Sequence, residues 1–391
     1  MHYIRLLSPP RLRWDSKASF LGLTFTITTD LGDTFLSPLK PISLQVLVSL
    51  SRLGDGDTFI APQMAPIWQA GMRVLKLELP LPSRALDTLL IRPADPRLCA
   101  ASAQDIMQSN QGLIVPVYVD LSAYGRDAPG VCFRRLDLRT GKNLGSNQLE
   151  VQEEIGESIA RHIWDAGLVT VAMLADLNLR ETNKQDDESL KWLKNIFSPP
   201  ASRKLGILEL GCGVGILGLG IATILQISAG PELSGASILL TDLPEAEDQA
   251  VTNIRRQLAT YKTPGMPCVV NFQYENLDWE DGRLGRFGPR VRSGIWDLVV
   301  LSDCTYNVDM LPLLVGTLSE LHAASVQRTG NTGAPCETKV LLATKPRHRS
   351  ESALFDFMVE SGWAIENKII LPLPVLASET ESVEIFLFSR Y

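Results

Sequence analysis

Residues 205–220 read LGILELGCGVGILGLG, and their pattern is the most informative in the chain. A short apolar run is interrupted by Glu209 and then by glycines, which stand at positions 211, 213, 215, 218 and 220. Glycine lacks a Cβ, so its backbone can adopt positive φ and approach a ligand closely, while a helix that follows points its N–H groups at that ligand. The stretch therefore predicts a buried parallel strand, a tight turn beside a bound ligand, and a helix.

Downstream of this stretch, strand-like and helix-like segments alternate. The pattern predicts helices at 216–227, 246–261, 311–325 and 350–362, strands at 237–242, 268–279, 296–307 and 339–347, and a closing pair of strands at 363–373 and 383–391. Parallel neighbours need crossover connections, so alternation of this kind indicates a mostly parallel sheet with helices on both faces. The closing pair, joined by a short loop, predicts an antiparallel hairpin at the sheet edge.

Upstream, the chain looks rich in strands. Alternating or β-branched runs at 19–38, 72–82 and 113–122 predict strands, and frequent prolines disfavour long helices. The pattern then changes, with helices expected within 153–179 and 186–197. We therefore divide the chain into a β-rich N-terminal module, residues 1–148, and a second domain, residues 149–391. The first module is either a packing extension or a platform for substrate recognition.

Composition narrows the class of protein. The 391 residues carry a formal net charge of −7, whereas binding to nucleic acid usually requires an excess of positive charge. The overall charge therefore does not indicate a nucleic-acid-binding protein. No apolar run approaches the ~20 residues of a membrane span, and no signal peptide is apparent, so we expect neither membrane insertion nor secretion. The six cysteines lie far apart without a CxxC pair, which favours isolated buried thiols and no metal site.

Three kinds of ligand compete for the glycine turn. A phosphate-binding P-loop requires a Lys after the glycines, and none follows. A dinucleotide site requires GxGxxG, which Gly213, Gly215 and Gly218 satisfy, with Asp242 at the end of the next strand for a ribose. This second interpretation assigns no role to Glu209 or Gly211.

The run ELGCGVG, residues 209–215, resembles motif I of the class I, or seven-β-strand, S-adenosylmethionine-dependent methyltransferases. The resemblance implies a Rossmann-like doubly wound seven-stranded sheet with S-adenosyl-L-methionine as cofactor. It also implies that the loop wraps the methionine part of the cofactor, and it assigns Asp242 to the ribose hydroxyls. The loop residues assigned in this way are Glu209, Gly211, Cys212 and Gly213.

Two more segments resemble the protein-lysine methyltransferases of methyltransferase family 16: IWDAG at 163–167 and SDCTYN at 302–307. By this resemblance Trp164 flanks the cofactor, Trp279 lies against the adenine, and the backbone of Ser302 approaches the adenine. Asp303 then faces the target amine, and Tyr306 shapes the channel that leads to it. No metal is implied.

The resemblance also limits the substrate. Enzymes that methylate amides or adenine carry NPPY or DPPY where this chain has DCTY, and the double-glutamate hairpin of arginine methylation is missing. Protein lysine therefore fits better. A long N-terminal β-module is compatible with a fungal branch of the family that methylates lysine in translation elongation factors, so such a factor is the expected client. A small-molecule amine stays open.

The remaining expectations concern binding partners, cellular location and alternative functions. We expect a monomer in the cytoplasm, with the nucleus as a second compartment, that binds a protein substrate and no nucleic acid directly. Substrate specificity is expected in the N-terminal module and in loops at 281–294 and 323–338. The rival functions are a non-catalytic binding or assembly protein with a methyltransferase fold, and an NAD(P)-dependent oxidoreductase.

Overall fold

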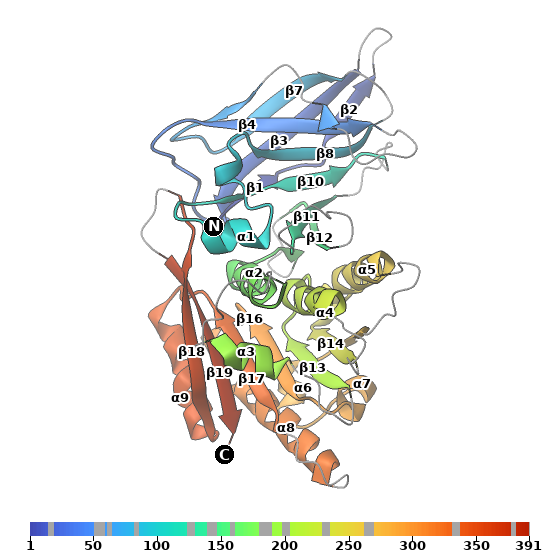
Figure 1. The fold of residues 1–391 in the computed structure, drawn as a ribbon, viewed down its shortest axis with the longest axis vertical. Coiled ribbons are helices and arrows are strands. Elements are labelled where there is room, and N and C mark those ends of the chain that lie inside the picture. The colour runs from blue at the N-terminus through green and yellow to red at the C-terminus, as the bar shows by residue number, and fades with distance from the viewer. Residues whose placement is uncertain are drawn as a thin grey trace. The chain divides into compact units, whose positions relative to one another are not determined.

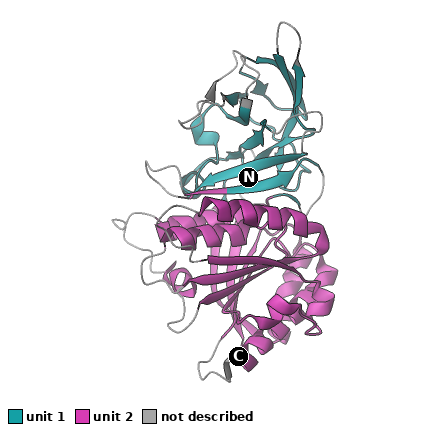
Figure 2. Cartoon of the chain, turned by 90° about the vertical axis from the view of Figure 1, so that its right-hand side faces the viewer, with its two compact units in different colours: residues 1–137, 150–162, 373–381 teal, residues 138–149, 163–372, 382–391 magenta. Residues whose placement is uncertain are grey.

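The structure is a computed structural model of the chain. It describes residues 1–14, 19–50, 59–60, 65–81, 86–122, 130–138, 147–156, 161–179, 190–197, 204–228, 235–261, 270–330, 337–376 and 381–390. The chain forms two compact units (Figure 2). Unit 1 comprises residues 1–137, 150–162 and 373–381, and unit 2 comprises 138–149, 163–372 and 382–391. The chain crosses between the units several times, so neither unit is one continuous segment.

Unit 1 is built from strands. Its elements are β1 (His2–Leu6), β2 (Arg11–Trp14), β3 (Ser19–Thr29), β4 (Ile42–Leu50), β5 (Phe59–Ile60), β6 (Ile67–Trp68), β7 (Leu75–Leu81), β8 (Leu86–Pro93), α1 (Ala103–Gln108), β9 (Ile114–Val115), β10 (Val117–Asp120), β11 (Val131–Asp137) and most of β12 (Gln148–Glu154). One sheet has the order β2-β3-β1-β9 with β7 beside β3, and the other has the order β12-β11-β10-β8-β4-β5 with β6 beside β4. The strands expected at 19–38, 72–82 and 113–122 are confirmed.

Both sheets of unit 1 contribute to one core. Phe25 and Ile27 of β3 belong to the same buried cluster as Val46 of β4 and Ile91 of β8. Strand side chains alternate between the two faces of a sheet, so each sheet can present an apolar face to a shared core. The short helix α1, which the sequence pattern did not predict, begins with a capping box between Ser102 and Asp105.

Unit 2 contains the predicted α/β fold. Its strands are β13 (Leu205–Leu210), β14 (Ala236–Asp242), β15 (Val270–Asn276), β16 (Leu298–Ser302), β17 (Lys339–Thr344), β18 (Trp363–Leu373) and β19 (Glu381–Arg390). They lie in the order β15-β14-β13-β16-β17-β19-β18. The strands from β15 to β17 are parallel, and β19 runs antiparallel to β17. The Rossmann-like doubly wound seven-stranded sheet with its antiparallel C-terminal hairpin is confirmed.

Helices cover both faces of this sheet (Figure 1). The described helices of unit 2 are α2 (Asp165–Leu179), α3 (Lys191–Ile196), α4 (Ile216–Ser228), α5 (Pro244–Thr260), α6 (Trp279–Gly282), α7 (Pro289–Ser293), α8 (Leu311–Gly330) and α9 (Ala353–Glu360). Figure 1 shows α2, α4 and α5 along one face and α8 and α9 along the other. The strand order switches between β13 and β16, because β14 and β15 extend the sheet on one side of β13, and β16 and β17 extend it on the other. Open α/β sheets bind ligands at such a switch point, beyond the carboxyl ends of the strands.

Two of the expected loops are partly helical, which corrects that expectation. The segment 281–294 contains α7, which begins at Pro289, a residue suited to the first helical position. The segment 323–338 is helical up to Gly330 as the end of α8, and 331–336 lies outside the described residues. Among the described residues, no helix combines the length and the apolar character that crossing a bilayer requires.

Candidate functional site

The glycine turn leaves the carboxyl end of β13 with a run of positive φ angles. Gly211, Gly213 and Gly215 have φ of 62°, 52° and 84°. This conformation is unfavourable for residues with a Cβ, and a Cβ at Gly211 would also lie only 2.7 Å from Cys304 Sγ. Asn253 of α5 supports the turn, since its buried Nδ2 donates to the Val214 carbonyl at 2.9 Å. The turn is a cradle that side chains would fill.

Glu209 is buried beneath this turn. Its Oε2 accepts the backbone N–H of Gly218, in the first turns of α4, at 2.9 Å. A Cβ at Gly218 would approach that oxygen to 2.5 Å, so the glycine permits this contact. Burial raises the pKa of Glu209 to about 8, against the opposing effect of the Gly218 hydrogen bond. Glu209 therefore links β13 to α4.

Asp242 ends the neighbouring strand β14 and faces the same turn. One carboxylate oxygen accepts the N–H of Gly213 at 2.7 Å, and the other accepts the N–H of Leu243 at 2.7 Å. Burial raises the pKa of Asp242, and these two hydrogen bonds oppose the shift. A carboxylate has about four acceptor positions, so two remain for a pair of ligand hydroxyls.

The indole of Trp279 and the thiol of Cys304 lie beside Gly211. A Cβ at Gly211 would be 3.4 Å from Cζ2 of Trp279, the first residue of α6. The Cys304 Sγ lies 3.5 Å from each of the Leu210 and Gly211 carbonyl oxygens. The ends of β13 and β16 are therefore in direct contact, which brings the glycine turn and the DCTY segment together.

Asp303 has an unusual backbone conformation at the end of β16. Its φ is 52°, and it is the one non-glycine residue with positive φ in the described part of the chain. Its Oδ2 accepts the N–H of Ala166 at 2.8 Å, and its Oδ1 accepts the N–H of Lys345 at 3.2 Å. The side chain is 4% exposed. Asp303 thus joins β16 to the start of α2 and to the segment that follows β17.

Two cations after β17 extend this network. Arg347 lies over the ring of Trp164, with its Cζ 5.1 Å from the ring centroid, and its Nη2 is 3.6 Å from Asp303 Oδ1. The Lys345 Nζ is 3.0 Å from Asp165 Oδ2. The IWDAG segment is therefore held against the DCTY turn through side chains at the end of β17.

The other predicted site residues lie at the same edge. Ser302 is the last residue of β16. A Cβ at Gly167 would lie 2.7 Å from Ile216 Cγ2 and 3.1 Å from Ser302 Oγ, which explains the glycine in IWDAG. Tyr306 is 60% exposed, so it is open to a ligand. Cys212 is buried within the glycine turn. All ten residues predicted for the site stand at the carboxyl ends of β13, β14 and β16 or at the starts of α2 and α6.

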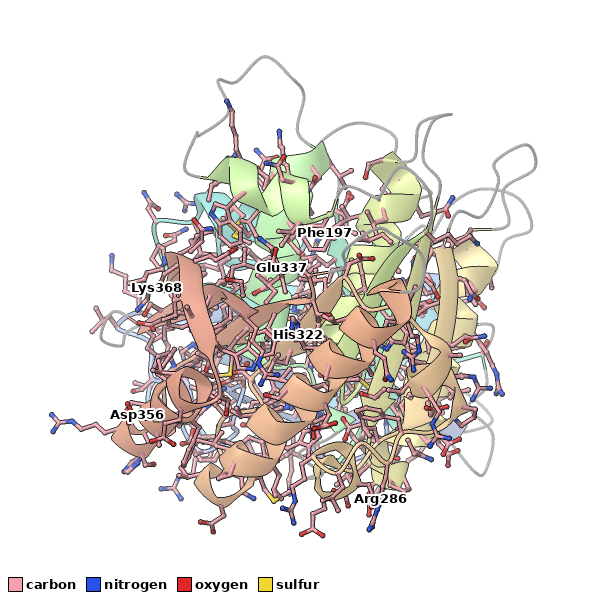
Figure 3. All side chains as sticks on the ribbon, turned by 90° about the horizontal axis from the view of Figure 1, so that it is seen from below. Phe197, Arg286, His322, Glu337, Asp356 and Lys368 are labelled. Atoms are coloured by element: carbon pink, nitrogen blue, oxygen red, sulfur yellow. The ribbon has the colours of Figure 1, made fainter. Side chains whose placement is uncertain are left out.

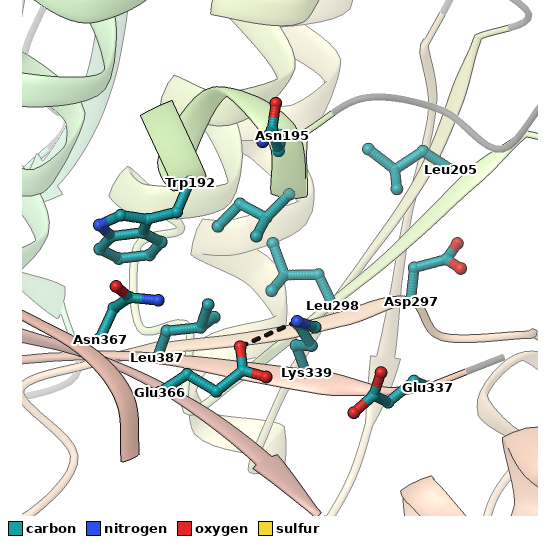
Figure 4. A pocket seen from close by; sticks show the side chains of 11 residues that line it. Trp192, Asn195, Leu205, Asp297, Leu298, Glu337, Lys339, Glu366, Asn367 and Leu387 are labelled. Carbon is teal, nitrogen blue, oxygen red and sulfur yellow. Dashed lines mark hydrogen bonds and ion pairs between the residues drawn. The ribbon is translucent and has the colours of Figure 1, made fainter. Parts of the chain in front are cut away.

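A different cavity lies at the opposite ends of the strands (Figure 4). Its volume is about 370 Å³, and it is lined by Trp192 of α3 together with the first residues of β13 and β17, Leu205 and Lys339. Because the glycine turn leaves the other end of β13, this cavity is separate from the site. His322 of α8 is separate as well, since it packs edge-on against Trp363 with ring centroids 5.6 Å apart (Figure 3).

Some residues that hold the IWDAG and DCTY segments together were not recognised as important from the sequence. Asp165 lies within IWDAG but received no role, and Lys345 and Arg347 lie in a segment interpreted only as a strand. The sequence did contain an indication of their role. Lys345 and Arg347 follow a strand that ends at the same edge of the sheet as the glycine turn, and basic residues in that position are candidates for a binding site. The pairing of Asn253 with Val214 has no comparable signal in the sequence.

The sequence is similar to that of a known protein family and of a known protein. A family model described as lysine methyltransferase matches residues 143–361, more than half of the chain. A UPF0665 family protein of Schizosaccharomyces pombe is 23% identical over 367 residues, which is 93% of each chain. Among solved structures, P. horikoshii TYW2 in complex with MeSAdo has 14% identity and a TM-score of 0.34, covering 70% of this chain and 75% of that one. Precorrin-6y C5,15-methyltransferase of Geobacter metallireducens has 10% identity and a TM-score of 0.31, covering 55% and 93%.

Proposed function

The chain belongs to the lysine methyltransferase family, and we propose that it methylates the side-chain amine of a lysine in a protein substrate. It is an S-adenosylmethionine-dependent methyltransferase with a Rossmann-like domain. The identity of the group that accepts the methyl group is our proposal. A small-molecule amine is the nearest alternative acceptor.

The residues at the strand ends fit the cofactor. Gly211 and Gly213 leave space in the turn for its methionine part, and Asp242 retains acceptor positions for two ribose hydroxyls. Trp279 beside Gly211 offers an aromatic face to the adenine, and Ser302 ends the neighbouring strand β16. Glu209 and Cys212 are buried in the turn, and Trp164, just before α2, would flank the cofactor.

The chemistry is an in-line displacement at the methyl carbon. When bound, S-adenosylmethionine supplies a methyl group activated by its sulfonium. Gly211, Gly213 and Asp242 would hold the cofactor so that its methyl group could pass to the lysine nitrogen, with the electron pair of the broken carbon–sulfur bond left on sulfur. Alignment is the main task of the protein. A free lysine amine has a pKa of ~10.4, so it must lose a proton before it can attack.

Asp303 and Tyr306 are the residues that we assign to the acceptor side. Asp303 accepts the backbone N–H of Ala166 through Oδ2 at the end of β16, beside the glycine turn, where a carboxylate can orient an amine. The exposed ring of Tyr306 lines the approach. The observation that carries this proposal is the positive φ of Asp303 next to the glycine turn, since strained backbone conformations concentrate at functional sites.

Two measurements test the proposal. The first is thermal stability with S-adenosylmethionine or NAD, since only a ligand of the native state stabilises it by mass action. We expect stabilisation by S-adenosylmethionine and none by NAD, and the reverse would favour the oxidoreductase. The second is methyl transfer by Asp303→Ala and Tyr306→Phe. Full transfer by Asp303→Ala would remove Asp303 from the acceptor side, and binding without any transfer by the wild type would favour the assembly protein.

The client is also part of the proposal. A translation elongation factor is the first candidate, because the sequence resembles lysine methyltransferases that act on such factors. The β-rich unit 1 is our candidate for substrate recognition. Deleting it is not a clean test, because segments of unit 1 alternate along the chain with segments of unit 2.

A further inference from the structure

A second cavity of unit 2, of about 390 Å³, lies beside the DCTY turn. Thr305, the residue between Cys304 and Tyr306, forms part of its wall, and Arg347 forms another part. Arg347 is the residue that contacts both Trp164 and Asp303. The cavity therefore shares a wall with the proposed acceptor site.

The carboxylates in the wall of this cavity already have partners. The Oε2 of Glu384 lies 3.0 Å from the Nζ of Lys368 of β18, which is labelled in Figure 3. Glu351 accepts the Thr305 hydroxyl at 3.1 Å through Oε2 and the His348 N–H at 3.1 Å through Oε1. Their charge and hydrogen-bonding capacity are thus partly used within the protein.

The wall also contains basic groups in a continuous segment. Arg347, His348 and Arg349 all line the cavity, and the side chain of Arg349 is exposed. Among the described residues, no carboxylate lies within ion-pair distance of Arg349. A guanidinium offers five N–H donors in a fork that matches a carboxylate, so this wall favours an anionic group.

We propose that this cavity binds an acidic side chain of the protein substrate, close to the lysine that is methylated. The inference rests on the proposed function, because it assumes a protein acceptor. Arg349 is the specificity-determining residue, and Pro346, Leu354 and Phe355 supply apolar contacts for the methylene groups of the acidic side chain. The substrate class is then a lysine with an Asp or Glu nearby on the client surface.

The test is a charge exchange between enzyme and client. The client lysine is first identified by transfer of a labelled methyl group from S-adenosylmethionine to proteins of a lysate of the source organism. Rates are then compared for the wild type, Arg349→Glu, and the control Arg255→Glu, an exposed arginine of α5 outside the cavity. In the client, each acidic residue near the lysine is changed to Lys in turn.

We expect Arg349→Glu to raise KM for the client about tenfold, because like charges then face each other, with the affinity for S-adenosylmethionine unchanged. One acid-to-Lys change in the client should give a similar loss and should restore transfer with Arg349→Glu. Wild-type KM for Arg349→Glu, or failure of every charge exchange to restore transfer, would overturn the subsite alone. Binding of S-adenosylmethionine without methylation of any protein lysine would overturn the proposed function, and the subsite with it.

Discussion

The Nζ of Lys345 lies 3.0 Å from Oδ2 of Asp165, and these side chains are 8% and 0% exposed. Removing one partner of a buried ion pair leaves an uncompensated charge, which costs about 3–5 kcal/mol. We therefore expect Lys345→Met to lower the free energy of unfolding by about that amount in denaturant titrations. The control is Lys339→Met, whose pair with Glu366 is partly exposed and should contribute about 1 kcal/mol or less. Equal losses for the two variants would contradict the structural role of Lys345.

Arg347 should act as a positioning residue. Its contacts with Trp164 and Asp303 hold the start of α2 against the DCTY turn. We expect Arg347→Ala to lower kcat about tenfold with a smaller change in the cofactor Kd, because displacement of aligned groups mainly affects the transition state. Arg347→Lys should recover part of kcat, since it keeps the charge but loses the planar fork. Steady-state kinetics with the client measure both, and an unchanged kcat for Arg347→Ala would refute the role.

Gly211→Ala should abolish cofactor binding. The substituted residue must keep a φ of 62° while its Cβ meets Cys304 Sγ at 2.7 Å, so the turn has to move. Gly130→Ala is the control, because nothing lies within 4 Å of a Cβ there. Calorimetric titration with S-adenosylmethionine compares the two variants. Normal affinity for Gly211→Ala would exclude the turn as part of the cofactor site.

Asp242→Ala should weaken cofactor binding. A charge-assisted hydrogen bond contributes about 1.5–3 kcal/mol, so losing the ribose contacts should raise Kd about 10-fold to 100-fold. The control Asp248→Ala removes an exposed carboxylate from α5. If the Kd values of both variants equal that of the wild type, Asp242 does not hold the ribose.

The raised pKa of Glu209 predicts that the free energy of unfolding depends on pH. Burial raises its pKa from 4.5 to about 8, so between these values the folded state binds more protons than the unfolded state. The contribution of Glu209 to stability is then present below pH 4.5 and is lost as the pH rises toward 8. The slope approaches about 1.4 kcal/mol per pH unit for one group. Unfolding titrations from pH 5 to 8 without cofactor should show stability falling more steeply for the wild type than for Glu209→Gln, and an identical slope in both would refute it.

Much of the fold followed from local patterns. The strand of residues 205–210 is buried throughout and apolar except for Glu209, and its glycine turn has the positive φ angles that glycine makes accessible. The closing hairpin was visible as two strands with a short connection. In unit 1, by contrast, the sheet pairings depend on contacts such as Tyr3 with Thr28, which are distant in the sequence and leave no local periodicity.

The candidate site was predictable in its residues but not in its connections. Asp242 and Asp303 end strands that meet at one edge of the sheet, so their proximity follows from topology. The hydrogen bond from Ala166 to Asp303 joins residues 137 positions apart, and no sequence pattern specifies it. The same holds for Lys345 and Arg347, whose partners became visible only with the side chains in place.

The central claim is that this site methylates a protein lysine. The most direct measurement is mass spectrometry of proteins from a lysate of the source organism after incubation with the purified protein and isotopically labelled S-adenosylmethionine. We predict labelled methyl-lysine at a defined position of one client, with the signal lost for Gly211→Ala. Labelled small amines or other labelled atoms, with no labelled methyl-lysine in any protein, would contradict the account.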